Sequence, residues 1–409
     1  MENTFELEIT DIAFGGNGLG RKDGFVYFVP GTLPGELILT GEVSRKKNFG
    51  TARLIEILRS SQDRINPVCP LAWAPCKNNK DAVGLQCPGC SYQHVKYEGE
   101  LKIKNRHLEN FIRHNLKIDP STVMDAPVAS LTDLNYRNKI VLHLSKNKLG
   151  YFADDNVSIV DVKNCPLADP EINAKLAEIR TDLNKYSGAA DITFRYTRKD
   201  NVQFWAENRP VGGVLEEETA FGVLEVPCGS FFQVNLKCAD LLAGETAKMA
   251  KDSKASNLVD LYCGCGFFSI AAAKGGIESV IGVDSDPDTI KSAVKNAVTN
   301  GLADKCRFFA KSAEVFMTEN SRKMKTDETV VLLDPPRGGL SLKLKNQLIS
   351  TGVVKIIYIS CAPDMMARDM KFLCECGFKL KRARLFDMFP RTSHFETIAH
   401  LEKCRGIDF

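Results

Sequence analysis

The sequence predicts a multidomain protein with a small N-terminal β-barrel, a central α+β domain that carries a cysteine-rich segment, and a C-terminal α/β domain. Three observations predict this arrangement. The chain of 409 residues is too long for one ordinary compact domain. Its first part contains short alternating strands separated by Gly and Pro turns, and its last part alternates apolar runs with helical patterns. We expect the domains to span residues 1–59, 60–215 and 216–409.

The composition excludes several classes of protein. Hydrophobic residues make up 44% and charged residues 26%, which are globular proportions and argue against bulk disorder. The net charge is only +3, so a nucleic-acid partner has to be argued from local patches. Neither a secretory signal nor an apolar run long enough to span a membrane is evident. We therefore expect a cytoplasmic protein, with no obligate protein partner evident, whose 14 cysteines are reduced, bind metal or act in catalysis.

The first 59 residues predict a small barrel. Gly15-Gly16-Asn17-Gly18 is a turn that needs positive φ, and Pro30 ends a strand. The expected strands are 5–9, 25–29, 36–43 and 51–57. The loop Arg45-Lys46-Lys47 is either solvated or a phosphate contact.

The central part begins with a segment that lacks a regular pattern. Residues 60–95 contain few apolar side chains and four cysteines, so we expect this segment to need an additional constraint, such as a bound metal, to become ordered. A helix follows, because Leu101, Leu108, Ile112 and Leu116 share one face. Its charged residues are expected to form the solvated face; they are Lys102, Lys104, Arg106 and Arg113. Strands are expected at 136–144 and 157–162.

The last part predicts a doubly wound parallel sheet. Short apolar runs occur at 257–262, 279–283, 329–333 and 354–359. Helical patterns lie between them, for example at 286–300 and 362–376. This alternation is typical of parallel sheets that are covered by helices on both faces.

A glycine turn in this part predicts a ligand site. Residues 258–266, Leu-Val-Asp-Leu-Tyr-Cys-Gly-Cys-Gly, run from a strand into a predicted helix at 267–274. Asp284 follows Gly264 by twenty residues and ends the next apolar run, where a carboxylate can bind ribose hydroxyls. Ser269 stands at the third glycine position of the dinucleotide pattern, which favours a ligand without phosphates, such as S-adenosylmethionine. An ordinary strand–helix turn is the alternative.

Reactive side chains follow the next strands. Asp334 comes after one apolar run and Cys361 after another, so both are expected on the rim that also holds Asp260 and Asp284. Cys361 is either a nucleophile or a small buried thiol. Two cysteines of the glycine turn, Cys263 and Cys265, compete for that role. Further on, Glu396 or His394 is a candidate general base, although a lone Glu in a strand is usually solvated.

Five cysteines outside this region have the pattern of a metal site. Cys87-Pro88-Gly89-Cys90 is a C-x₂-C pair, Cys69 and Cys76 precede it, and Cys165 lies far downstream. Four thiolates suit zinc or a [4Fe–4S] cluster, and the spacing does not choose between them. Unrelated thiols are the alternative.

Five motifs in order resemble the RNA 5-methyluridine methyltransferases over essentially the whole chain. They are Phe232-Gln233-Val234-Asn235, Leu-Tyr-Cys-Gly-Cys-Gly at 261–266, Asp-Pro-Pro-Arg at 334–337, Ser-Cys-Ala-Pro with Ala-Arg-Asp at 360–363 and 367–369, and Thr-Ser-His-Phe-Glu-Thr at 392–397. The N-terminal part, with Val-Pro-Gly-Thr-Leu-Pro-Gly-Glu at 29–36, resembles a TRAM domain of the OB-like type. The resemblance implies a Rossmann-like methyltransferase domain at the C-terminus.

The resemblance also implies roles for single residues. It makes Cys361 the nucleophile, Glu396 the base and Arg137 a contact of the target base. The residues implied to surround S-adenosylmethionine are Gln233, Tyr262, Asp284 and Asp334. The residues implied to hold an iron–sulfur cluster are Cys69, Cys87, Cys90 and Cys165, with Cys76 as the alternative to Cys69. The chain departs from the family pattern at Ala362, where Asn is usual, at Asp284, where Glu is more frequent, and at Cys265, where the family varies.

The implied chemistry needs a thiolate and a base. Uracil C5 is a poor nucleophile until a thiolate adds to C6, and the C5 proton must leave before the thiolate is eliminated. The uridine must also be flipped out of any stack. We expect methylation of uridine C5 in 23S ribosomal RNA, with tRNA as the second candidate substrate. A non-catalytic RNA-binding protein and an iron–sulfur redox enzyme are the hypotheses from other classes.

Overall fold

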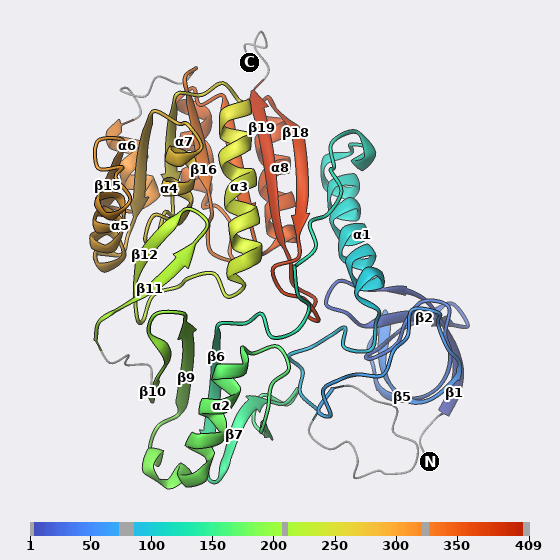
Figure 1. Ribbon diagram of the computed structural model, residues 1–409. Coiled ribbons are helices and arrows are strands. Elements are labelled where there is room, and N and C mark those ends of the chain that lie inside the picture. The colour runs from blue at the N-terminus through green and yellow to red at the C-terminus, as the bar shows by residue number, and fades with distance from the viewer. Residues whose placement is uncertain (1–3, 73–85, 207–211, 321–326, 404–409) are drawn as a thin grey trace.

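The N-terminal strands form the expected closed barrel in the computed structural model, which describes residues 4–72, 86–206, 212–320 and 327–403 (Figure 1). The strands are β1 (Thr4–Ile12), β2 (Gly18–Lys22), β3 (Phe25–Val29), β4 (Leu37–Arg45) and β5 (Phe49–Arg59). Their order is β1-β2-β3-β5-β4, and β1 pairs with β4 to close the barrel. The pattern did not predict β2, because its glycines hide the alternation. A Cβ at Gly20 would meet the carbonyl oxygen of Glu8 at 2.5 Å, so a side chain does not fit there.

The central part contains an antiparallel sheet of five strands in the order β10-β9-β6-β7-β8. Its strands are β6 (Lys139–Ser145), β7 (Lys148–Phe152), β8 (Ile159–Asp161), β9 (Asp191–Thr197) and β10 (Asn201–Ala206). Helix α2 (Pro170–Ile179) packs against this sheet and continues into the 3₁₀ helix η2 (Arg180–Tyr186). The shared core contains Phe194 of β9 and Leu176 of α2, both fully buried.

The C-terminal part is a seven-stranded sheet in the order β15-β14-β13-β16-β17-β19-β18. Its strands are β13 (Asn257–Leu261), β14 (Ser279–Asp284), β15 (Cys306–Ala310), β16 (Thr329–Leu333), β17 (Lys355–Ser360), β18 (Phe378–Phe386) and β19 (Glu396–Lys403). The first five in chain order are parallel, whereas β19 is antiparallel to both β17 and β18. A hairpin of β11 (Val214–Thr219) and β12 (Gly222–Pro227) precedes the sheet.

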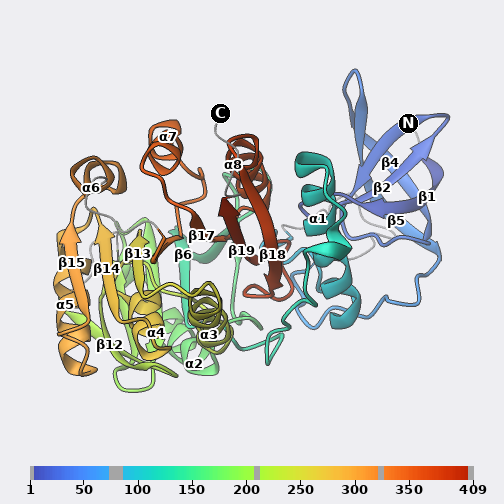
Figure 2. The same ribbon diagram turned by 90° about the horizontal axis from the view of Figure 1, so that it is seen from above.

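Helices cover both faces of this sheet (Figure 2). One face carries α3 (Leu236–Asp252), α4 (Phe267–Lys274) and α5 (Pro287–Thr299), and the other carries α6 (Ala313–Asn320), α7 (Leu342–Ser350) and α8 (Pro363–Glu375). Successive side chains of a strand point to opposite faces, so a strand covered twice must be apolar throughout. In β16, accordingly, Val330 and Leu332 lie in one core and Val331 and Leu333 in the other.

Helix α1 (Tyr97–Leu116) extends the layer of α8 and leads through η1 (Pro120–Thr122) to the edge of the sheet. Leu108 and Ile112 are buried in the same core as α8. Lys102 and Arg113 are exposed as expected, but Lys104 is fully buried. The expectation of a solvated Lys104 was therefore wrong, because buried carboxylates surround its ammonium group. No helix of the described residues is long and apolar enough to cross a membrane.

Candidate functional site

The site is built on the carboxyl ends of the parallel strands, where the sequence predicted it. Tyr262 follows β13, Asp284 ends β14, Asp334 follows β16 and Cys361 follows β17. Because the strands run in the order β14-β13-β16-β17, these four side chains succeed one another along one edge of the sheet. Loops at this edge of an open α/β sheet form the ligand crevice.

The antiparallel strand β19 brings the candidate base to the candidate nucleophile. Ser360, the last residue of β17, lies opposite Thr397, so Cys361 follows the pair on one strand and Glu396 precedes it on the other. Glu396 is only 5% exposed, and its Oε2 has no hydrogen-bond partner among the described residues. His394, the other candidate base, is exposed in the loop before β19. The geometry thus favours Glu396 over His394 as the group beside the thiol.

The charged groups around Cys361 have opposite effects on the pKa of its thiol. Burial raises the pKa of its thiol to about 11, and the carboxyl groups of Glu396 and Asp334 add to the rise. Arg337 acts in the opposite sense, since its positive charge and a hydrogen bond lower the thiol pKa. Burial and the nearby Asp334 likewise raise the pKa of Glu396, and Arg337 again lowers it. Sequence reasoning gave Arg337 no role, although its place in Asp-Pro-Pro-Arg at 334–337 was a usable signal.

Two aspartates on the rim are held as unusually weak acids. Burial and the Asp284 carboxylate raise the pKa of Asp260 to about 7, although a hydrogen bond from Ser269 opposes the rise. The Ser269 hydroxyl donates to Asp260 Oδ2 over 2.6 Å, which explains why a serine stands at the third glycine position. Burial and Asp260 raise the pKa of Asp334 to about 7. A cation bound beside these carboxyl groups would favour their ionised forms.

The glycine turn is held by the acidic residue that follows it in the sequence. The Gly264 amide donates to Asp284 Oδ2 over 3.0 Å. Tyr262 has φ of 82°, a left-handed conformation that a non-glycine residue rarely adopts and that often marks a functional turn. Cys263 and Cys265 are buried, with 6% and 4% exposure, and burial raises the pKa of both thiols. Both therefore suit packing better than nucleophilic attack.

The segment before α3 contains a buried side-chain amide, that of Gln233. Gln233 is 5% exposed, and its Oε1 has no hydrogen-bond partner among the described residues. Its backbone is fixed, because Asn138 Nδ2 donates to the Gln233 carbonyl over 3.2 Å. Asn235 serves the fold instead: it caps α3 and donates to Ser130 Oγ and to the Met388 carbonyl. The free oxygen of Gln233 is therefore an acceptor available to a ligand.

Four of the five predicted cysteines line one cavity of about 350 Å³. They are Cys69, Cys87, Cys90 and Cys165. Burial, together with the neighbouring thiols, raises the pKa of Cys87 to about 11 and that of Cys90 to about 12. No group of three or more His, Cys, Asp or Glu side chains that could hold a single metal ion occurs in the described ranges. Cys76 lies outside the described residues.

Arg137 is one of the charged residues that line the cysteine cavity. Its side chain lines the cavity together with Lys139, and its amide donates to the Leu167 carbonyl over 2.9 Å. Desolvation lowers the pKa of His394, and the positive charge of Arg137 is one of several that add to this effect. Phe231, which sequence reasoning did not select, is 73% exposed at the mouth of the same cavity. An exposed phenylalanine beside two cations is suited to stack on a nucleic-acid base.

One family model and several known proteins are similar to this chain. The family model of tRNA (uracil-5-)-methyltransferase matches residues 217–404. An uncharacterized RNA methyltransferase of Bdellovibrio bacteriovorus is 31% identical, over 98% of this chain and 95% of that protein. A 23S rRNA (uracil(1939)-C(5))-methyltransferase RlmD of Stenotrophomonas maltophilia is 29% identical, over 98% and 97%.

A solved structure shares the whole fold. It is the Pyrococcus abyssi tRNA (uracil-54, C5)-methyltransferase in complex with S-adenosyl-L-homocysteine, with a TM-score of 0.72 and 24% identity. The match covers 97% of this chain and all of that one. The relative that is 31% identical over nearly all of both chains and the matching family model together show the class of enzyme to which the chain belongs. The chain belongs to the RNA (uracil-C5) methyltransferase family.

Proposed function

We propose that this enzyme transfers a methyl group from S-adenosylmethionine to C5 of a uridine in 23S ribosomal RNA through a covalent bond between Cys361 and C6 of the uracil. The register of β17 and β19 carries this proposal, because it puts a thiol and a buried carboxyl group side by side. The rim of weakly acidic carboxyl groups beside them suits a cationic methyl donor.

Cys361 acts as the nucleophile. Its thiolate adds to C6, the C5=C6 electron pair moves towards C4=O, and C5 becomes enolate-like. C5 can then accept the methyl group. Arg337 favours the thiolate over the thiol and lies beside the position where negative charge develops.

Glu396 acts as the base in the second half of the reaction. Its carboxylate removes the C5 proton, the C–H electron pair restores C5=C6, and the sulfur leaves C6 as thiolate. Because Glu396 is buried beside Asp334, its pKa is raised and its carboxylate is a stronger base than an exposed glutamate. Loss of the ligand's positive charge on methyl transfer favours proton uptake by Glu396 at this step.

The residues present fit S-adenosylmethionine, which supplies an electrophilic methyl group when bound. Asp284 stands at the position that binds ribose hydroxyls, and the free Oε1 of Gln233 is an acceptor for an ammonium group. Tyr262 and Asp334 follow β13 and β16 at the same edge of the sheet as Cys361. Desolvation raises the pKa of Tyr262 to about 12, so the ring remains neutral.

The cysteine cavity fits a [4Fe–4S] cluster held by Cys69, Cys87, Cys90 and Cys165. These four cysteines line one cavity whose other lining residues are mostly apolar, with Tyr151 among them. Burial raises the pKa of the thiols of Cys69, Cys87 and Cys90, whereas bound iron would hold the cluster ligands as thiolates. The cluster would staple the loops that carry Arg137 and shape the RNA-binding surface, and no redox step is needed for methyl transfer.

RNA is the substrate class because the similar proteins are named as RNA methyltransferases, and a target base in RNA must be flipped out to react. Phe231 and Arg137 are the side chains we assign to the unstacked bases next to the target. Relatives named RlmD favour 23S rRNA, and this substrate puts the reaction in the cytoplasm. The family description and the Pyrococcus abyssi structure favour tRNA as the second candidate.

A single labelling experiment tests the proposal. The enzyme is incubated with labelled S-adenosylmethionine and total RNA that lacks 5-methyluridine, and ribosomal and transfer RNA are then separated. Label in 5-methyluridine of 23S rRNA, absent with Cys361→Ala, is the expected result. Label in tRNA would change the substrate, and label in neither would overturn the proposed activity.

A further inference from the structure

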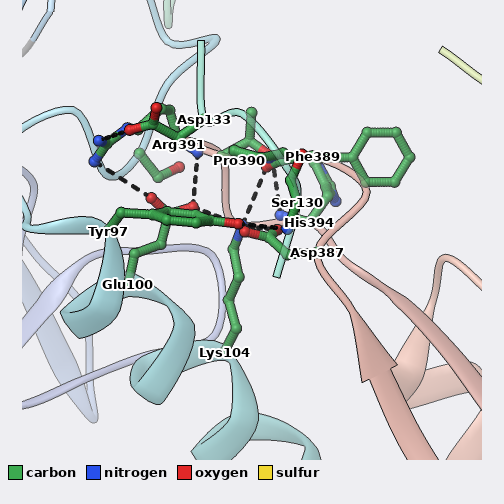
Figure 3. A network of polar contacts seen from close by, with 12 residues as sticks. Tyr97, Glu100, Lys104, Ser130, Asp133, Asp387, Phe389, Pro390, Arg391 and His394 are labelled. Carbon is green, nitrogen blue, oxygen red and sulfur yellow. Dashed lines mark hydrogen bonds and ion pairs between the residues drawn. The ribbon is translucent and has the colours of Figure 1, made fainter. Parts of the chain in front are cut away.

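A buried cluster of charges joins helix α1 to the loop that leads to Glu396 (Figure 3). Lys104 is fully buried, and its Nζ uses all three of its donors. They bond Glu100 Oε1 over 2.7 Å, Asp387 Oδ1 over 2.7 Å and the Phe389 carbonyl over 3.1 Å. Two of these three acceptors belong to residues 387–395, which connect β18 to β19.

Arg391 holds the same loop from its other side (Figure 3). Its backbone amide donates to Glu100 Oε1 over 2.7 Å, and its side chain donates to the Val95 carbonyl and pairs with Asp133. Its φ is 68°, so the backbone is in the left-handed region that a side chain normally avoids. The Tyr92 amide donates to the Arg391 carbonyl over 3.0 Å and helps to hold this conformation.

Hydrogen bonds continue from this cluster towards the base. The Phe389 carbonyl, which accepts from Lys104, also accepts from Thr392 Oγ1 over 2.8 Å. Thr392 Oγ1 in turn accepts from the His394 amide over 3.2 Å. Glu396 begins β19 two residues later, opposite Phe386. The loop is thus bonded at several successive residues between the ends of the two strands.

Attachment of α1 alone does not require these charges. Leu108 and Ile112 already pack α1 against the core shared with α8. Buried ion pairs are costly to desolvate, and apolar side chains of similar volume often stabilise a fold as well or better. The charges add a defined geometry instead, because each hydrogen bond of Lys104 requires an acceptor at one particular position.

We propose that Lys104 is a positioning residue for catalysis: through Asp387, Phe389 and Glu100 it fixes the loop 387–395 so that the Glu396 carboxyl group faces the uracil C5 bound at Cys361. The proposal rests on the base role given to Glu396 above. It makes α1, which touches no reacting atom, part of the machinery for the elimination step.

The chemistry gives this role a distinct signature. Thiolate addition and methyl transfer do not need Glu396, whereas removal of the C5 proton does. If the loop shifts, the C5–H bond breaks slowly and the C6–S bond persists. A displacement of about 1 Å at a catalytic group can lower a rate by about 100-fold. The enzyme would then accumulate as a methylated covalent adduct with RNA, which a purely structural defect would not produce.

The test compares four variants of the full-length enzyme with the wild type. Lys104→Met removes the ammonium group and leaves the carboxylates of Glu100 and Asp387 without it. The double variant Lys104→Met/Glu100→Gln also removes the Glu100 carboxylate, but its amide oxygen can still accept from the Arg391 amide. Arg382→Met is the matched control, because Arg382 pairs with Asp125 and Glu245 at the edge of the sheet. Glu396→Gln is the reference for loss of the base. The readouts are kcat, KM for each substrate, and the fraction of enzyme joined to labelled RNA on a denaturing gel.

We expect Lys104→Met, or the double variant if the single one does not fold, to lower kcat at least about tenfold with little change in KM. Both it and Glu396→Gln should accumulate methylated adduct, and Arg382→Met should not. Accumulation with Glu396→Gln but not with either Lys104 variant would overturn the positioning role alone. If Glu396→Gln itself forms no adduct, the base assignment fails and the positioning role fails with it.

Discussion

Ser360 and Thr397 face each other across β17 and β19, and this pairing puts Cys361 next to Glu396. The two reactive residues are 35 positions apart in the chain and belong to strands that run in opposite directions. A parallel neighbour would have turned Glu396 away from the carboxyl end of β17. The antiparallel edge of the sheet is therefore what brings the proposed nucleophile and the proposed base together at the proposed methyl-donor site.

Reactivity of Cys361 is expected to depend on pH and on the methyl donor. The pKa of the free enzyme's thiol is raised to about 11, so its thiolate fraction grows as the pH rises from about 7 to about 9. Bound S-adenosylmethionine carries a positive charge and should lower that pKa, so alkylation at fixed pH should become faster unless the ligand blocks access. The uncharged product S-adenosylhomocysteine is the control for blocking. Alkylation of the Cys361 peptide, followed by mass spectrometry, measures both effects; a rate that does not change with pH would contradict them.

Arg337→Gln is expected to lower kcat by about 10- to 100-fold, because the positive charge that favours the Cys361 thiolate is lost. The same substitution should move the rising limb of the pH–rate profile to higher pH. Arg337→Lys keeps the charge and should recover part of the rate. A Gln variant with the wild-type pH profile would show that Arg337 does not act on the thiol.

Asp260→Asn is expected to stabilise the ligand-free protein at high pH. The folded-state pKa of Asp260 is raised to about 7 from an ordinary value near 3.8, so the folded state binds a proton that the unfolded state has released. Wild-type stability is therefore lost as the pH rises from about 4 through about 7. At pH 8 the variant should exceed the wild type by about 4 kcal/mol in free energy of unfolding, and at pH 4 the two should be similar. Denaturant unfolding at both pH values measures this difference; equal differences at the two would refute it.

Iron content should distinguish the two candidate ligands upstream of the C-x₂-C pair. Cys69 lines the cavity with the other three thiols, so Cys69→Ser should lower iron and sulfide per chain and weaken the visible absorbance. Cys76→Ser should leave both unchanged and serves as the matched control. The reverse pattern would make Cys76 the ligand. If neither substitution lowered the iron content, neither Cys69 nor Cys76 would be a ligand, and the proposed set of four cysteines would be excluded.

Much of the α/β sheet could be predicted from the sequence because its strands are buried on both faces. Continuous apolar runs predicted β13, β14, β16 and β17 within a residue or two, and the helix expected at 267–274 begins and ends there. The positions of Asp284, Asp334 and Cys361 followed from the rule that ligands bind at the carboxyl ends of parallel strands. These predictions needed only local patterns and one general rule of topology.

Features that depend on tertiary partners could not be predicted. Burial of Lys104 depends on Asp387, a residue more than 280 positions away. The helical pattern alone predicts that such a lysine is exposed to solvent. The pairing of β19 with β17 likewise leaves no local signal, so the sequence suggested a base at Glu396 or His394 without deciding between them. Arg337 was visible as part of a motif, but its effect on the thiol required the folded site.

The covalent bond between Cys361 and uracil C6 is tested most directly with RNA in which the target uridine carries fluorine at C5. The thiolate can add and the methyl group can be transferred, but Glu396 has no C5 proton to remove, so the adduct cannot be eliminated. After incubation with S-adenosylmethionine and digestion, mass spectrometry should find a methylated fluorouridine nucleotide on the peptide that contains Cys361. A nucleotide on another cysteine, or full turnover without any adduct, would contradict the account.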